Sequence, residues 1–324
     1  MDTLPLNLGM IASYYYISYA TIELFSLSLK PKTKTRGLLE IISNANEFAN
    51  FPVRYKEDVI LKKLAEKLPN ALKNQNWSDP HTKVLLLLNA YLARIQLSAE
   101  LNKDIEFIVL KATRLTQACV DVLSSNGWLT PAIHAMELSQ MLTQAMFSHE
   151  SYMKQLPHAN SALLERCKEK GVDSIFNLLE LDDDERNDLL QMSRAELADV
   201  ARFCNNYPSI EVEHEVSTSK VAPGDSVTVT VRLERENDEN GYAPSVVAPF
   251  YPLKRKDEGW WLVIGDVEAN TLSCIKRLPV NSKASQELVF NPTEIGKHKY
   301  KLYFMCDSYL GADQEFDFTV RVEG

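Results

Sequence analysis

The hydrophobic positions of the first 150 residues recur at steps of three and four, the spacing of a buried helical face. The clearest stripe comprises Ile105, Ile108, Val109, Ala112, Leu115, Cys119, Val120 and Leu123. Similar patterns predict helices at 8–29, 38–45, 59–68 and 83–97. A sixth helix begins near Pro131, which fits a first turn, and is expected to run to about Phe147. Residues 1–150 are therefore predicted to form a helical bundle.

Residues 151–207 form a second, smaller helical segment. Pro157 opens its first helix and Gly171 is expected to stop it. The tetrad Ser193-Arg-Ala-Glu196 is a capping box that starts the last helix. The run Asn205-Asn-Tyr-Pro208 ends that helix and marks a domain boundary.

From residue 208 to residue 324 the period changes to two, which is typical of strands with one buried face. Turns are expected at Pro223–Asp225 and Asn237–Gly241. About seven short strands in some 115 residues predict an immunoglobulin-like or fibronectin-type β-sandwich. The predicted fold is thus multidomain, with two helical domains followed by an all-β domain.

The charge of the chain is unevenly distributed. The 324 residues carry a net charge of −9. Residues 1–150 hold 15 basic and 14 acidic groups, residues 151–207 hold 7 and 11, and residues 208–324 hold 13 and 19. An acidic surface does not attract phosphate, so general nucleic-acid binding is not predicted and any RNA contact is expected to be local.

The usual catalytic signatures are missing from the sequence. It contains no GxxxxGK[ST] loop, no GxSxG elbow and no HExxH pair. The acidic run Asp182–Glu185 begins a predicted helix, where it is expected to complement the helix dipole rather than to bind metal. The five cysteines are scattered without a CxxC pair, which favours buried thiols in a reducing compartment. We therefore expect no catalytic residues, no metal and no cofactor, and neither a membrane span nor a signal peptide.

Several stretches resemble a known family. They are 115–129 (LTQACVDVLSSNGWL), 155–158 (QLPH), 166–172 (RCKEKGV), 198–204 (ADVARFC) and 258–265 (EGWWLVIG). They are similar to the Sec-sixty-three homology units of the two-cassette RNA helicases of the U5 small nuclear ribonucleoprotein, and among these to the second, C-terminal unit. The resemblance runs from about Leu4 to Val322, so it covers essentially the whole chain.

The resemblance implies a function. Such helicases unwind small nuclear RNAs during spliceosome activation, with motor domains upstream of each unit, and the second cassette is regarded as an inactive docking platform. It implies a nuclear, non-catalytic, protein-docking unit whose partners are spliceosomal proteins and the upstream motor domains of the same parent chain. An RNA-guiding element that contacts single-stranded RNA beside the motor is the alternative. The related unit of the endoplasmic-reticulum translocation machinery fits less well, because its membrane spans and J-domain are not found here.

The resemblance also nominates RNA-contact residues. The last bundle helix of related helicases touches the threaded strand, and its aromatic and polar contacts fall on Phe147 and Gln140, with Gln144 on the same predicted stripe. A spacing of seven residues is about two helical turns, so Gln140 and Phe147 are expected to point the same way. The alternative is that this stripe faces the missing motor domains, and in an inactive cassette we favour it.

Two further features are weighed in the same way. The second helical segment resembles a helix-hairpin-helix module, but its hairpin Pro157–Asn160 lacks the glycines that let backbone amides approach phosphate, so packing is favoured over phosphate binding. Trp260 and Trp261 point to opposite faces of a strand and are candidate protein-docking residues. One ring is expected in the core, and the other is either exposed as an anchor or covered by the helical segment. The patch Lys254–Lys256 is interpreted as a solvated loop rather than an RNA site.

Overall fold

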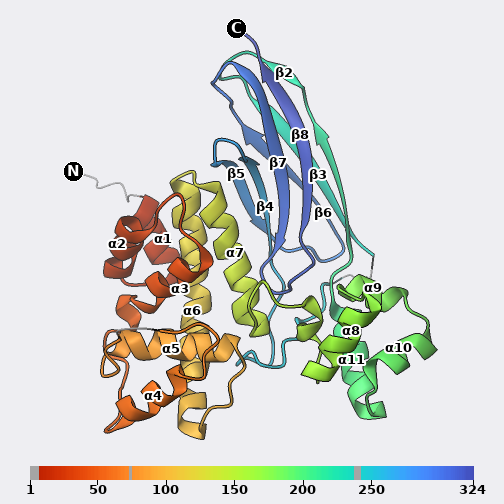
Figure 1. Cartoon of the computed structure of the whole chain (residues 1–324). Helices are drawn as coiled ribbons and strands as arrows, with labels where there is room; N and C mark the ends of the chain where they lie inside the picture. The colour runs from red at the N-terminus through yellow and green to blue at the C-terminus, as the bar shows by residue number, and fades with distance from the viewer. Residues whose placement is uncertain (1–6, 73–74, 237–241) are drawn as a thin grey trace. The chain divides into compact units, whose positions relative to one another are not determined.

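The computed structural model describes residues 7–72, 75–236 and 242–324. The chain divides into two compact units, Met1–Phe147 and Ser148–Gly324. The first unit is helical, and the second combines helices with two β-sheets (Figure 1). This mixture of helices followed by strands agrees with the order predicted from the sequence. The predicted turn at 237–241 and the start of the resemblance at Leu4 lie outside the described residues.

The first unit begins with two helices where the sequence predicted one. Its elements are α1 (Asn7–Tyr15), α2 (Tyr19–Ser28), α3 (Thr35–Ser43), the 3-10 helix η1 (Asn46–Phe48), α4 (Glu57–Ala65), α5 (Pro80–Leu92), α6 (Ala99–Ser125) and α7 (Leu129–Gln144). The predicted helix at 8–29 is interrupted because Tyr16 adopts a left-handed φ of 51°. Ser18 then caps α2 by accepting a hydrogen bond from the N–H of Ala20.

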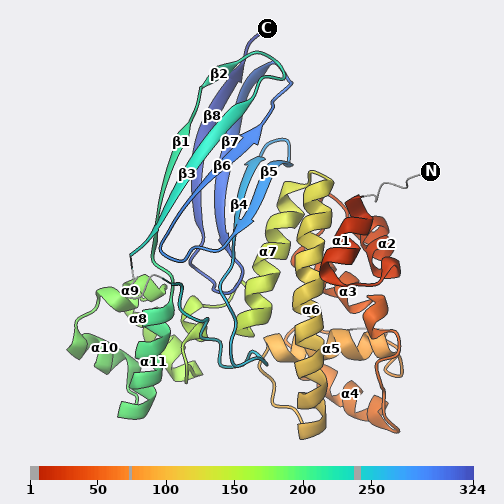
Figure 2. The ribbon, with the colours of Figure 1, turned by 180° about the vertical axis from the view of Figure 1, so that it is seen from behind.

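Helix α6 is the long helix of this unit. Its 27 residues begin after Ser98, whose side chain accepts a hydrogen bond from the N–H of Leu101. All eight positions of the predicted stripe between Ile105 and Leu123 are buried. Helices α6 and α7 lie side by side in both views (Figure 2). The period of 3.6 residues thus correctly predicted which face of α6 enters the core.

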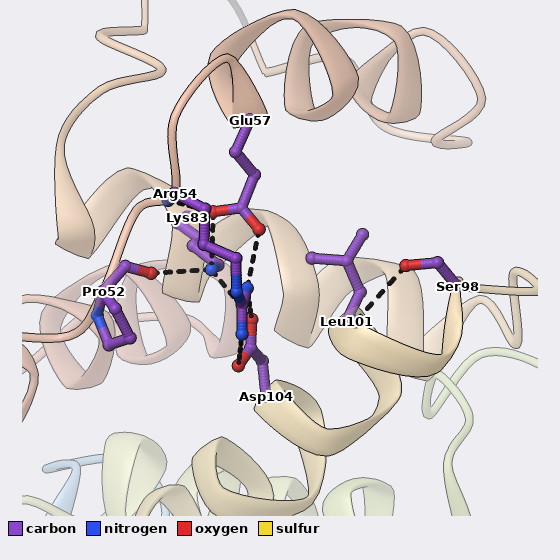
Figure 3. A network of polar contacts seen from close by, with 7 residues as sticks. All are labelled: Pro52, Arg54, Glu57, Lys83, Ser98, Leu101 and Asp104. Atoms are coloured by element: carbon purple, nitrogen blue, oxygen red, sulfur yellow. Dashed lines mark hydrogen bonds and ion pairs between the residues drawn. The ribbon is translucent and has the colours of Figure 1, made fainter.

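A buried cluster of charges joins α4, α5 and α6 (Figure 3). The Lys83 ammonium is fully buried and lies 2.8 Å from a carboxylate oxygen of Glu57, 2.8 Å from one of Asp104 and 2.7 Å from the carbonyl oxygen of Pro52. Arg54 donates two further hydrogen bonds to Asp104, at 2.6 and 2.8 Å. A buried ammonium without such partners would be strongly destabilising, so these contacts make the position of Lys83 in the core possible.

The C-terminus of α7 is closed by side chains from the region of α5. The hydroxyl of Tyr91 donates to the carbonyl of Leu142 at 2.8 Å. The guanidinium of Arg94 donates to the carbonyls of Gln144 and Ala145, at 2.9 and 2.8 Å. Ala145 has a left-handed φ of 51°, which stops the helix. The prediction that this helix continues to Phe147 is therefore wrong, because these tertiary hydrogen bonds end it at Gln144.

The second unit opens with short helices. They are the 3-10 helix η2 (Tyr152–Gln155), α8 (Ser161–Lys170), α9 (Ile175–Glu180), α10 (Asp183–Leu190) and α11 (Arg194–Asn206). Gly171 ends α8 with a φ of 68°, as predicted. The predicted capping box of Ser193 and Glu196 is present in α11, and Asp182 and Glu185 form another in α10. The acidic run at 182–185 therefore lies at a capped helix start.

Two sheets follow these helices. Their strands are β1 (Ile210–Val216), β2 (Lys220–Val221), β3 (Val227–Arg235), β4 (Trp260–Asp266), β5 (Thr271–Leu278), β6 (Lys283–Phe290), β7 (Gly296–Cys306) and β8 (Gln314–Val322). The strand orders are β1-β3-β6 and β2-β8-β7-β4-β5. Neighbouring strands are antiparallel, except that β2 is parallel to β8. The described residues hold one strand more than the seven predicted, because β2 is only two residues long.

Helices and sheets of the second unit share one hydrophobic core. The Trp260 ring stacks on Phe304 of the neighbouring strand, with ring centroids 4.1 Å apart. The side-chain amide of Gln155 exchanges two hydrogen bonds with the backbone of Leu310, at 2.8 and 2.9 Å. The hydroxyl of Tyr207 donates to the same carbonyl at 2.8 Å. The helical segment is thus tied to the sheets by buried contacts as well as by the chain.

Within the described residues, no helix is both long enough and apolar enough to cross a lipid bilayer. The same residues contain no group of three or more His, Cys, Asp or Glu side chains placed to hold a metal ion. The five cysteines are free thiols, and burial raises the pKa of Cys204 to about 11. Their environments favour the neutral thiol over the reactive thiolate.

Candidate functional site

The predicted RNA-contact residues lie at the end of α7. Gln140 and Gln144 are on the helix and are only 2% and 1% exposed. Phe147 comes after the left-handed residue Ala145, so it is not on the helical stripe of Gln140. The expectation that Gln140 and Phe147 lie two turns apart on one continuous helix is therefore wrong.

Phe147 is buried rather than presented as a stacking platform. Its side chain lines a small cavity of about 60 Å³ with Leu39, Leu72, Leu85 and other residues of the first unit. A ring that stacks on a base needs an accessible face. Contact of Gln140, Gln144 and Phe147 with RNA stays a prediction, and it would require these buried side chains to become accessible.

Trp260 belongs to the core, as expected for one of the two tryptophans. Besides stacking on Phe304, its indole N–H donates to a carboxylate oxygen of Glu258 at 2.6 Å. The same oxygen accepts a hydrogen bond from the guanidinium of Arg235, and both charged side chains are buried. The Trp260 ring therefore covers a buried ion pair at the end of the sheet.

Trp261 points to the opposite face of β4. The guanidinium carbon of Arg277, on the paired strand β5, lies 4.4 Å from its ring centroid. Arg277 is held there by a hydrogen bond of 2.8 Å to Asp307. Trp261 is 1% exposed, so the interpretation of one tryptophan as an exposed anchor is wrong. A role for either ring in protein docking stays a prediction.

The hairpin at 157–160 is built without glycine. His158 adopts a left-handed φ of 62°, the conformation that glycine takes most easily. The side chain of Asn160 caps α8 by accepting from the N–H of Leu163 at 2.9 Å, and the N–H of Ala159 donates to the carbonyl of Leu156 at 3.2 Å. These hydrogen bonds favour packing over phosphate binding at this turn.

A groove of about 670 Å³ lies beside this hairpin in the second unit. Its size is within the range of ligand-binding clefts. The hairpin contributes Pro157 and His158, and α11 contributes Asp199, Arg202 and Asn206. The rest of the lining comes from the loop between β3 and β4, namely residues 245–254 and Lys256.

The loop that lines the groove has an unusual composition. The eleven residues 243–253 carry no charged side chain and include three prolines. Because proline has no N–H to donate, this segment is poorly suited to a central strand. Phe250 and Leu253 are 50% and 52% exposed. The loop thus places large apolar side chains at the surface.

Hydrogen bonds fix this loop to the second unit. The N–H of Val246 donates to the carbonyl of Lys256 at 2.9 Å, and the N–H of Val247 donates to the hydroxyl of Tyr309 at 2.8 Å. The side-chain amide of Asn206, on α11, donates to the carbonyl of Ser245 at 2.9 Å. The wall of the groove is therefore attached both to a helix and to the segment after β7.

The groove is locally basic. His158 and Arg202 flank Asp199, at 2.8 and 3.9 Å from its carboxylate oxygens. The ammonium of Lys256 is held by Asp307 at 3.2 Å and by Ser308 at 2.6 Å. Lys254 is exposed and makes no ion pair within the described part of the chain, and the Arg202 side chain is 67% exposed. Arg202 and Lys254 are therefore the basic groups most open to a ligand.

This groove was not predicted from the sequence. Lys254–Lys256 were interpreted as a solvated loop, and Arg202 was not connected with them because 51 residues separate Arg202 from Lys254. A signal was present in the uncharged, proline-containing run directly before the three basic residues. An apolar run that has no strand or helix period is a candidate exposed surface.

Comparison with known families gives one match that covers nearly the whole chain. Residues 5–319 match the model described as Sec63 Brl domain. The match includes the helical first unit, the hairpin and most of the sheet region. It spans both compact units rather than one of them.

Curated relatives agree with this match. The U5 small nuclear ribonucleoprotein 200 kDa helicase of Caenorhabditis elegans is 66% identical over 323 residues, and that of Homo sapiens is 56% identical over 324. The Arabidopsis thaliana DExH-box ATP-dependent RNA helicase DExH12 is 47% identical over 329 residues. Each alignment covers 100% of this chain and 15% of the relative, so the chain spans about one seventh of these proteins.

Among solved structures, the CARDB domain of a Pyrococcus furiosus protein in complex with di-metal ions covers 36% of this chain. The identity is 14% and the TM-score is 0.25. A β-glucosidase from Listeria innocua covers the same share, at 12% identity and a TM-score of 0.24. Scores this low support no conclusion about function.

Proposed function

The chain belongs to the Sec63 Brl domain family, and from this premise we propose that it is a non-catalytic, protein-docking unit of a spliceosomal RNA helicase. The observation that carries the proposal is the alignment of the whole chain with 15% of the U5 helicases at up to 66% identity. We further propose that it is the second, C-terminal such unit of the parent protein. Its partners would then be spliceosomal proteins and its compartment the nucleus.

The absence of a motor sequence supports the non-catalytic role. ATP-dependent helicases of this kind hold the phosphates of ATP in a GxxxxGK[ST] loop, and this sequence contains none. The remaining 85% of the relatives' length has room for such domains. We propose that this chain acts beside a motor and does not itself hydrolyse ATP.

The charge of the second unit favours protein docking over RNA binding. Residues 148–324 carry 20 basic and 31 acidic side chains, a net charge of −11. Such a unit repels the phosphates of RNA over the range of a Debye length. The burial of Gln140, Gln144 and Phe147 also favours protein docking over RNA binding. An RNA-guiding element beside the motor is the alternative function.

Exposed aromatic side chains of the first unit support a contact with the upstream motor domains. Tyr14, Tyr16 and Tyr19 are 75%, 88% and 69% exposed, and Met10 nearby is 55% exposed. Large apolar side chains gathered on a surface are typical of an interface. We propose that this part of α1 and α2 packs against another domain of the parent chain.

The finer fold assignments belong to the same proposal. Two sheets that share one core, with mainly antiparallel strands, support an immunoglobulin-like sandwich for residues 208–324. The hairpin at 157–160, which lies between the 3-10 helix η2 and α8, supports a helix-hairpin-helix-like unit for residues 151–207. A helical bundle at 1–150 completes the proposed three-domain division.

ATP turnover and protein capture by the purified chain test the proposed function together. We expect no turnover, with or without single-stranded RNA, and we expect immobilised chain to retain U5 proteins from nuclear extract. RNA-stimulated hydrolysis that persists through purification would contradict the non-catalytic role. Failure to retain any spliceosomal protein would contradict the docking role.

A further inference from the structure

The groove beside His158 combines exposed apolar side chains with exposed basic ones. One wall carries the exposed apolar side chains of Phe250 and Leu253. The rim carries the exposed basic side chains of Arg202 and Lys254. A ligand that fits both must itself carry apolar and acidic groups.

We propose that this groove binds an extended acidic peptide segment of a partner protein. An aromatic or leucine side chain of the peptide would pack against Phe250 and Leu253. Carboxylates on either side of it would pair with Arg202 and Lys254. This proposal rests on the protein-docking function proposed above, and it assigns a place and a chemistry to one partner.

Charge complementarity makes an acidic segment the occupant that fits. The groove is lined by Arg202, Lys254 and Lys256 against the single acid Asp199, although the unit as a whole has a net charge of −11. A generally acidic protein repels an acidic peptide everywhere except at a local basic site. The same field that disfavours non-specific capture would therefore direct such a peptide to this groove.

The groups that would hold the carboxylates are available. Arg202 is 3.9 Å from Asp199, which is longer than a direct hydrogen bond, and Asp199 already contacts His158 at 2.8 Å. Lys254 makes no ion pair among the described residues. Lys256, by contrast, is held by Asp307 and Ser308, so it contributes to the local potential but not to a direct contact.

The wall is positioned before any ligand arrives. The N–H of Val246 donates within the loop to the carbonyl of Lys256, the N–H of Val247 donates to the hydroxyl of Tyr309, and Asn206 holds the carbonyl of Ser245. Three prolines further restrict the loop. A preformed wall reduces the conformational entropy that is lost when a flexible peptide binds.

A randomised 12-residue peptide phage library, panned on the intact chain, tests the proposal. We expect the selected peptides to be rich in Asp and Glu around an aromatic or leucine residue. Their affinity, measured as synthetic peptides by fluorescence polarisation, should fall at least about tenfold in Arg202→Glu with Lys254→Glu. Phe250→Ser should weaken the same peptides without a change of charge.

The matched control is Lys220→Glu with Lys299→Glu. These two lysines are 64% and 71% exposed, lie on the sheets and make only long ion pairs, so the control makes the same change in net charge away from the groove. Affinity should be kept in this control. Melting temperatures of all variants establish that the fold is intact.

Three results of the peptide selection would overturn the proposal. They are the selection of no peptides, the selection of peptides without acidic residues, and binding that the groove variants leave unchanged. Binding of a 12-nucleotide single-stranded RNA that is lost in the same variants would replace the peptide with RNA as the occupant. If peptide binding is unchanged in the groove variants while the wild-type chain retains U5 proteins from nuclear extract, the groove assignment fails and the docking function stands. If even the wild-type chain retains none, the docking function itself fails.

Discussion

Single residues carry large consequences where charge is buried. Lys83 is fully buried, yet its ammonium contacts Glu57, Asp104 and the carbonyl of Pro52. In sequence this lysine marks the start of an apolar run and suggests only a helix boundary. Its partners lie 26 and 21 residues away, so its burial depends on tertiary contacts that periodicity does not contain.

Lys83→Met is expected to destabilise the first unit by about 3–5 kcal/mol, because it leaves two buried carboxylates with only Arg54 as a counter-charge. Urea unfolding, followed by hydrogen exchange of the α6 amides, reports on this unit. The control is Arg36→Ala, which breaks an exposed pair with Glu40 and should cost at most about 1 kcal/mol. Equal effects of the two changes would show that the buried cluster is energetically unimportant.

The same cluster makes a pH dependence predictable. Desolvation raises the pKa values of Glu57 and Asp104, but hydrogen bonds and charges from Lys83 and Arg54 outweigh it, and both pKa values lie below their usual 4.5 and 3.8. Carboxylates with lowered pKa values stabilise the fold when the pH is above their usual pKa. This contribution is lost as the pH falls through the lowered pKa values of the folded state. The first unit should therefore lose stability below about pH 4.

Asp104→Asn provides the check on this pH dependence. The variant should be less stable than the wild type at pH 7 but should lose less additional stability between pH 5 and pH 3, since one of the two linked carboxylates is gone. Chemical unfolding at several pH values measures both slopes. A slope as steep as that of the wild type would assign the acid sensitivity to other groups.

At the scale of elements, sequence patterns predicted what is local and missed what is tertiary. The stripe of α6 and the capping box at Ser193 are set by neighbouring residues, and both were predicted. The end of α7 is set by Tyr91 and Arg94, which lie 50 or 51 residues before the carbonyls that they bind. The prediction that the helix continues to Phe147 was therefore wrong. The groove was missed for the same reason, because α11 and a loop without periodicity build it together.

Arg94→Ala should fray the last turn of α7. The guanidinium donates to the carbonyls of Gln144 and Ala145, and hydrogen bonds from charged groups contribute about 1.5–3 kcal/mol. Faster hydrogen exchange at 141–147, with little change in α6, is the expected result. The control is Arg114→Ala, at an exposed position of α6. If the amides of 141–147 exchange equally slowly in both variants, Arg94 does not cap the end of α7.

At the scale of the whole molecule, the two compact units differ in net charge. Residues 1–147 carry 15 basic and 13 acidic side chains, whereas residues 148–324 have a net charge of −11. Family membership extends over both units. Under the proposed function we therefore expect protein docking to involve the acidic unit, and we expect any RNA contact to come from the nearly neutral one.

Titration of a labelled single-stranded RNA with the purified chain is the measurement that tests protein docking against RNA guiding most directly. We predict a Kd no tighter than about 10 µM at physiological salt, in the range of non-specific binding. Phe147→Ala and Gln140→Ala, checked for folding by thermal melting, should leave this weak binding unchanged. The contradicting result is RNA binding with a submicromolar Kd that is lost in either variant, while the variant still melts like the wild type. That result would contradict the docking role and establish the RNA-guiding alternative.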